Sequence, residues 1–123
     1  MKKILISDSI DKSCISILQG LGYEVVYKPG MTPVQIKNEI GNYNGLIVLS
    51  ETKVNWELIS QMAEMEIIGR AGSGVDNIDV DAATRRGIIV MNTPGGNTIS
   101  AAEHTMALML SMCRNVPQAN ISV

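Results

Sequence analysis

Residues 45–49 read Gly-Leu-Ile-Val-Leu, a short run without a polar side chain. A strand formed by this run would be apolar on both faces. A strand of this kind is typical of a parallel sheet covered by helices on both sides, because neither of its faces meets water. Before and after this run, short β-rich segments alternate with stretches of helical spacing. We predict five strands, at residues 3–7, 23–27, 45–49, 66–69 and 88–91.

The segments between these strands carry apolar residues at helical spacing and residues that favour helix ends. Ser9 is expected to cap the first helix, and Thr32 with Pro33 to begin the second. Further helices are predicted near residues 55–63, 79–86 and 100–114. Strands that are each followed by a helix form a parallel sheet with right-handed crossovers. The expected fold class is α/β, a flavodoxin-like five-stranded parallel sheet of order 2-1-3-4-5 with helices on both faces.

The composition is that of a globular domain, with 46% apolar and 18% charged residues in a chain of 123. A net charge of −2 and an aromatic content of 3% offer neither a basic surface nor stacking platforms for nucleic acid. No apolar run reaches the ~18 residues that a membrane span needs, and the first strand leaves no room for a signal peptide. We therefore expect a cytoplasmic protein with no nucleic-acid or membrane partner.

Several self-contained catalytic or binding motifs are absent from the sequence. It contains neither GxGxxG nor GxxxxGK[ST], and the turn at residues 7–11 has too few glycines and threonines for a flavin phosphate. The third strand ends without the carboxylate of a phospho-receiver domain. Cys14 and Cys113 lack the CxxC spacing of redox or zinc sites, so we expect two free buried thiols and no metal.

The single histidine, His104, lies beside Glu103 in the first turn of a predicted helix. We interpret it as a structural residue, with a catalytic base as the alternative, and Glu103 as part of a capping box. Asp76, Asn77 and Asp79 are interpreted as turn and helix-capping residues. None of these polar residues has the neighbours that a nucleophilic mechanism requires.

Two glycine-containing loops follow the fourth and fifth strands. In the first, residues 70–74 (Arg-Ala-Gly-Ser-Gly), backbone amides can converge on an anion and form a nest for a carboxylate. The alternative is a plain glycine turn. The second loop, residues 92–97, presents Asn97 toward the same crevice or serves only as a helix entry. Ligands of such sheets bind at the carboxyl ends of the strands, where both loops lie.

The whole chain resembles the D-2-hydroxyacid dehydrogenase family, and within it the D-3-phosphoglycerate dehydrogenases. The resemblance rests on GRAGSGVDN, followed at family spacing by NTPGGN-x-x-S-A-A-E, and on further matching stretches. These stretches are ISDSID (6–11), GLIVLSETKV (45–54), AATRRGIIVM (82–91) and CRNVPQA (113–119).

The resemblance implies an NAD-dependent parent enzyme in which this domain forms one wall of the substrate cleft. The backbone of Ala71, Gly72, Ser73 and Gly74 would receive the substrate carboxylate, and Ser73 would also come near the nicotinamide. Ser50 and Asn97 would face the substrate. The family's catalytic arginine, glutamate and histidine and its GxGxxG loop belong to a second domain.

One position departs from the family pattern. Leu49 stands where phosphoglycerate dehydrogenases commonly have an arginine that holds the charged substrate. Leucine cannot form a charge-assisted bond to a carboxylate or phosphate. We expect Lys53 or a residue of another domain to compensate, or the affinity for 3-phosphoglycerate to be weaker.

The last predicted helix, from Ser100 to Arg114, is apolar nearly all round. Such a helix is normally buried on every side, and one sheet covers only one of them. We expect residues 1–99 to form the substrate-binding domain, 100–116 a crossover helix toward a missing NAD-binding domain, and 117–123 a tail. The helix would pack against that domain or mediate self-association as a dimer-forming surface.

We therefore predict a substrate-binding fragment of an NAD-dependent dehydrogenase. It would bind a 2-hydroxy acid such as 3-phosphoglycerate weakly, bind no cofactor by itself, and be inactive in isolation. The alternative is a standalone flavodoxin-like binding or assembly module.

Overall fold

A computed structural model of the chain describes residues 2–10, 12–71 and 76–92. The strands are β1 (Lys3–Ile6), β2 (Glu24–Tyr27), β3 (Gly45–Val48), β4 (Ile67–Arg70) and β5 (Ile89–Asn92). The helices are α1 (Ser13–Gly20), α2 (Pro33–Glu39), the short 3₁₀ helix η1 (Ile40–Asn42), α3 (Trp56–Ile59) and α4 (Val80–Arg85). Each strand lies within one residue of its predicted bounds.

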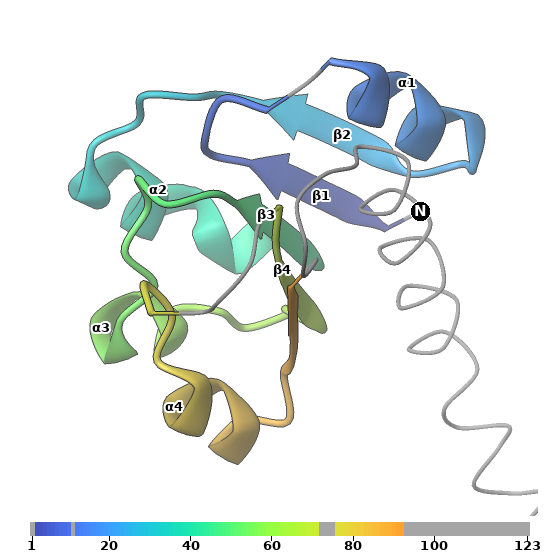
Figure 1. Ribbon diagram of the computed structural model, residues 1–123. Coiled ribbons are helices and arrows are strands. Elements are labelled where there is room, and N and C mark those ends of the chain that lie inside the picture. Colours follow the sequence, from blue (N-terminus) through green and yellow to red (C-terminus); the bar gives the residue numbers. More distant parts are fainter. Residues whose placement is uncertain (1, 11, 72–75, 93–123) are drawn as a thin grey trace, which may run out of the picture.

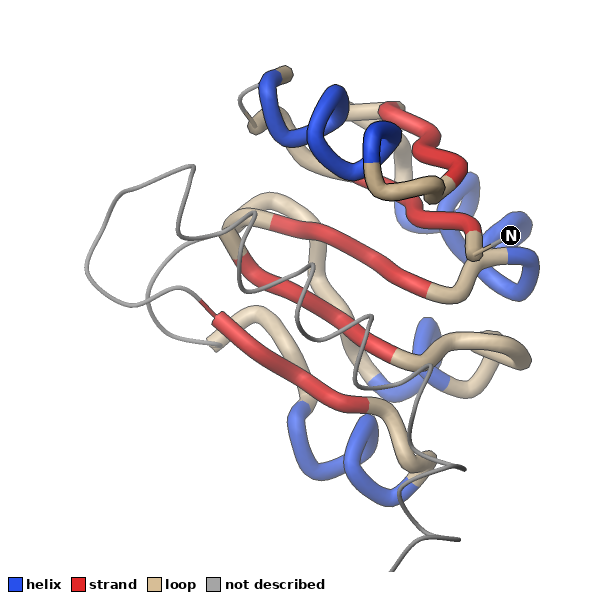
Figure 2. The backbone as a smooth tube through the Cα atoms, turned by 90° about the vertical axis from the view of Figure 1, so that its right-hand side faces the viewer, coloured by secondary structure: helices blue, strands red, loops and turns tan. Residues whose placement is uncertain are grey.

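The strands form one sheet in the order β2-β1-β3-β4-β5, and every neighbouring pair is parallel. The predicted α/β class and strand order are therefore confirmed. Figure 1 shows the order of the elements, and Figure 2 shows the strands side by side with helices on both faces. β3 is central, and all four of its residues are buried, as its apolar sequence predicts.

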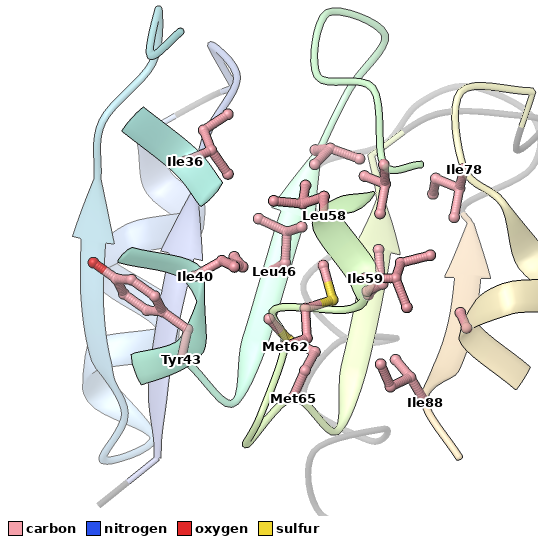
Figure 3. Close-up of a cluster of buried hydrophobic side chains, with 14 of the residues drawn as sticks. Ile36, Ile40, Tyr43, Leu46, Leu58, Ile59, Met62, Met65, Ile78 and Ile88 are labelled. Atoms are coloured by element: carbon pink, nitrogen blue, oxygen red, sulfur yellow. The ribbon is translucent and has the colours of Figure 1, made fainter. Parts of the chain in front are cut away.

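Alternate residues of each strand enter two separate hydrophobic cores. In β1, Leu5 packs into the core under α2, α3 and α4, whereas Ile4 and Ile6 pack under α1. The same alternation separates Leu46 from Ile47 in β3. Figure 3 shows the larger core, where Ile40, Leu46 and Ile59 come together from helix and strand. Because successive side chains of a strand point to opposite faces of the sheet, each strand supplies apolar residues to both cores. Helices cover both faces and complete these cores.

The predicted start of α2 is confirmed in full. The Thr32 hydroxyl accepts a hydrogen bond from the Gln35 amide at 3.2 Å, and the Gln35 side chain accepts one from the Thr32 amide at 2.9 Å. This capping box satisfies amides that a helix start otherwise leaves unpaired. Ile36 and Ile40 are buried, whereas Val34, at the start of the helix, is 66% exposed.

Two helix predictions are wrong at their ends. α1 begins at Ser13 after Lys12, with no side-chain cap, so Ser9 does not cap it. α3 covers only residues 56–59, because the amides of Gln61 and Met62 bond three residues back and tighten the chain into turns.

Some sequence predictions fall outside the described residues. These are the helix at 100–114, the domain boundaries at 99 and 116, the tail, His104 and Cys113. Cys14 is buried, as expected, and is not part of a disulfide. Within the described ranges no helix has the length and apolarity to cross a membrane. The same ranges contain no cluster of three metal-ligating side chains.

Candidate functional site

The carboxyl ends of the parallel strands meet at one edge of the sheet. Val48 of β3 is in register with Arg70 of β4, and Arg70 with Asn92 of β5. The segments that leave this edge are Ser7–Asp8 after β1, residues 49–53 after β3 and Ala71 after β4. Polar side chains from the first two segments, together with Arg70 at the end of β4, therefore lie at the edge where such sheets bind ligands.

Asp8 holds the segment that follows β3, which we call the β3 loop (residues 49–53). Its Oδ2 atom accepts hydrogen bonds from three backbone amides, those of Leu49 (2.7 Å), Thr52 (3.0 Å) and Glu51 (3.2 Å). Its Oδ1 atom accepts a bond of 2.5 Å from the Thr52 hydroxyl. Asp8 is only 2% exposed. Hydrogen bonds from the loop therefore replace the water that an exposed carboxylate would bind.

Asn77 holds the same loop from the other side. Its side-chain amide donates two hydrogen bonds of 2.8 Å, one to the Leu49 carbonyl and one to the Thr52 carbonyl. Next to it, the Val54 amide donates to the Asn77 carbonyl, and the Asp79 amide donates to the Val54 carbonyl. The β3 loop is thus fixed through its amides by Asp8 and through its carbonyls by Asn77.

Arg70 and Asp76 form an ion pair at the same edge. Hydrogen bonding to the Arg70 guanidinium, followed by a backbone hydrogen bond, holds the pKa of Asp76 below its usual value, and the charge of Lys53 adds slightly. The Arg70 side chain is 11% exposed, and its Nε atom has no hydrogen-bond partner among the described residues. Its charge is thus already partly balanced before any ligand binds.

Only some of the predicted site residues lie within the described part of the chain. Ser50 and Lys53 are exposed on the β3 loop, and Leu49 is partly buried between its two anchors. The Ala71 amide donates to the Val48 carbonyl at 2.8 Å, so it extends the sheet. Gly72, Ser73, Gly74 and Asn97, which complete the predicted set, lie outside the described residues. Asp79 caps α4 through the Ala82 amide, as predicted.

Three residues of the edge were not predicted from the sequence. Asp8 lies two residues after the buried strand β1, at the carboxyl edge of the sheet, and a carboxylate at such a position could have been noticed in the sequence. Thr52 is 7% exposed and bonds both Asp8 and the Ser7 hydroxyl. Asn77 was interpreted only as a turn residue, because its partners lie far away in the sequence.

A cavity of about 400 Å³ lies behind the β3 loop, between it and α2. Lys37 and Val34 line it from α2, and Lys53 and Thr52 from the loop side. The polar groups at its base, on Ser7, Asp8 and Thr52, are bonded to one another. These three groups are therefore already paired with one another, whereas Lys37, Glu51 and Lys53 also line the cavity.

The end of β1 does not fit a dinucleotide. In dinucleotide-binding folds the turn after the first strand is glycine-rich and brings backbone amides to the pyrophosphate. Here that turn carries the Asp8 carboxylate, which would repel a phosphate and which already accepts the amides of another loop. The turn after β1 therefore lacks the free backbone amides that hold a pyrophosphate in such folds.

The chain matches the family model described as "D-isomer specific 2-hydroxyacid dehydrogenase, catalytic domain" over residues 4–120. It is 49% identical over 121 residues to a D-3-phosphoglycerate dehydrogenase from Archaeoglobus fulgidus, covering 98% of this chain. It is 46% identical over 123 residues to the human D-3-phosphoglycerate dehydrogenase, covering all of this chain. The chain spans 23% of the length of each of these relatives.

Solved structures show the same relationship. An NAD⁺-bound 3-phosphoglycerate dehydrogenase from Entamoeba histolytica matches with a TM-score of 0.69 and 33% identity, covering 76% of this chain and 33% of that one. The TT0316 protein from Thermus thermophilus matches with a TM-score of 0.71 and 28% identity, covering 97% of this chain and 39% of that one.

Proposed function

The chain belongs to the D-isomer specific 2-hydroxyacid dehydrogenase family, and we propose that it forms the substrate-binding wall of such an enzyme. The observation that carries the proposal is the β3 loop, which is fixed from two sides and presents Ser50 and Lys53 to solvent at the carboxyl edge. A rigid polar loop at this edge suits the orientation of a small substrate.

The proposed substrate class is a 2-hydroxy acid, with 3-phosphoglycerate as the first candidate because D-3-phosphoglycerate dehydrogenases are among the similar proteins. The Ser50 hydroxyl would donate a hydrogen bond, and the Lys53 ammonium group would attract the carboxylate or the phosphate. Amides of Gly72, Ser73 and Gly74, together with Asn97, complete the proposed binding set. The Arg70 guanidinium is already paired with Asp76. We therefore assign the attraction of the substrate's negative charge to Lys53 of the β3 loop.

In the proposed parent reaction, NAD accepts a hydride from C2 of the substrate. The described residues of this chain would bind and orient the substrate, and none of them is placed as the base that takes the hydroxyl proton. We therefore propose that the 123-residue chain forms no NADH by itself. A second domain, self-association through residues 100–114 and a cytoplasmic location stay predictions.

The proposal is tested by titrating the chain with two ligands and following its backbone amides by NMR. One ligand is 3-phosphoglycerate, and the other is glycerol 3-phosphate, which lacks the carboxylate. We expect dissociation constants of about millimolar or weaker for 3-phosphoglycerate and clearly weaker binding of glycerol 3-phosphate. Equal affinities would contradict recognition of the carboxylate, and no shift with either ligand would contradict the proposed function itself.

A further inference from the structure

The buried carboxylate of Asp8 is not among the residues proposed above to contact substrate. It is 2% exposed, and within the described ranges it forms no ion pair. Its charge is balanced by three amides and one hydroxyl, all from the β3 loop. Asp8 therefore stabilises that loop in one particular shape.

The geometry resembles an anion-binding nest that already contains its anion. Successive amides that converge on one point usually bind a phosphate or a carboxylate from a ligand. In this chain the amides of Leu49, Glu51 and Thr52 converge on the Oδ2 atom of Asp8 instead. The inner side of the loop is thus used internally, and its exposed residues, Ser50 and Lys53, remain for a ligand.

We propose that Asp8 is a positioning residue for substrate binding, acting through the backbone of the β3 loop to hold Ser50 and Lys53 in place. This inference rests on the proposed function. Without the carboxylate, the loop amides would be buried without an acceptor, which is unfavourable, so the loop would move toward solvent. Ser50 and Lys53 would then sample many positions, and the ordering of these groups would oppose ligand binding.

Variants of the 123-residue chain separate this role from a general loss of stability. Asp8→Ala removes the acceptor, and Asp8→Glu keeps the charge but moves it by one methylene group. Asp8→Asn keeps an oxygen that can accept the amides, so it should largely restore the loop. Asn44→Ala is the matched control, because Asn44 accepts from the Lys3 amide and donates to the Glu64 carbonyl at the opposite end of the sheet.

Two readouts are needed, amide hydrogen exchange and the dissociation constant for 3-phosphoglycerate. For Asp8→Ala we expect exchange of the Leu49, Glu51 and Thr52 amides to accelerate about tenfold or more, while the strand amides stay protected. We expect binding to weaken about tenfold, as the loss of ~1.4 kcal/mol would give. Asp8→Glu should also weaken binding, whereas Asp8→Asn should bind within about threefold of the unmodified chain.

The outcomes distinguish the inference from the proposed function. Unchanged affinity in Asp8→Ala with accelerated loop exchange would overturn the positioning role, as would an equal loss of affinity in Asn44→Ala. If Asp8→Ala fails to fold, Asp8→Glu decides, and wild-type affinity in that variant would overturn the inference. Failure of the unmodified chain to bind 3-phosphoglycerate would instead contradict the proposed function.

Discussion

The side-chain amide of Asn77 donates a hydrogen bond of 2.8 Å to the carbonyl of Leu49, across 28 residues of sequence. This bond joins the segment before α4 to the loop that leaves the central strand. Because Asn77 also bonds the Thr52 carbonyl, one buried side chain fixes two carbonyls of the β3 loop. The shape of the β3 loop at the carboxyl edge therefore depends on a buried residue from a distant part of the sequence.

Replacing Asn77 should lower the stability of the fold. Asn77→Ala leaves two carbonyls without their donor, and we expect the free energy of unfolding to fall by about 1–3 kcal/mol. Urea denaturation measures this change. Asn38→Ala, on the exposed surface of α2, is the control and should alter the unfolding free energy by less than about 0.5 kcal/mol. Similar losses of unfolding free energy in the two variants would argue against a stabilising role for the two hydrogen bonds of Asn77.

An arginine at position 49 should strengthen binding of 3-phosphoglycerate. The backbone of Leu49 is held at both its amide and its carbonyl, so a guanidinium group would extend from a fixed point. We expect Leu49→Arg to lower the dissociation constant about tenfold through charge-assisted hydrogen bonds. Leu49→Gln, which is polar but uncharged, should give a smaller change. If Leu49→Arg does not improve the affinity for 3-phosphoglycerate, Leu49 is not the cause of weak substrate binding.

Removing the charge of Lys53 should weaken binding modestly. An exposed charge pair contributes about 0.2–1 kcal/mol, so Lys53→Gln should raise the dissociation constant by a factor of about 1.4 to 5. Lys37→Gln is the informative control, because Lys37 lines the cavity behind the loop from α2. We expect Lys37→Gln to bind normally. A larger loss in Lys37→Gln than in Lys53→Gln would place the ligand in that cavity instead.

Tyr43 should make the fold sensitive to alkaline pH. It is 3% exposed and donates a hydrogen bond of 2.8 Å to Glu39, and burial, then that bond and the nearby carboxylates, raise the pKa of its hydroxyl above the usual 10. A raised pKa favours the folded state below pH 10, and this contribution is lost as pH rises further, because the unfolded chain releases the proton first.

The variant Tyr43→Phe tests this prediction. At neutral pH it should be less stable than the unmodified chain by about 1.5–3 kcal/mol, since a hydrogen bond to a carboxylate is lost. Above pH 10 the difference should shrink by about 1.4 kcal/mol per pH unit. Unfolding free energies measured from pH 8 to 11.5 check this, and a constant difference would be inconsistent with a buried neutral Tyr43.

The fold was predictable because its signals are local. The apolar run at residues 45–49 and the start of α2 at Thr32 and Pro33 depend on neighbours in sequence, and both appear in the structure as expected. The roles of Asp8 and Asn77 at the carboxyl edge were not predicted, because their hydrogen-bond partners are distant in the sequence. Asp8 bonds residues more than 40 positions away, so its role emerges only when β1 and β3 are paired. Ser9 does not cap α1, because the helix begins four residues later, at Ser13.

The most direct test of the central claim is the location of the amide shifts when the chain is titrated with 3-phosphoglycerate. If the carboxyl edge is the binding wall, the largest shifts will lie in the β3 loop and around Arg70 and Ala71, with small shifts at the opposite end near Asn44. Shifts concentrated near Asn44, or in the cavity lining at Val34 and Lys37, would contradict the account.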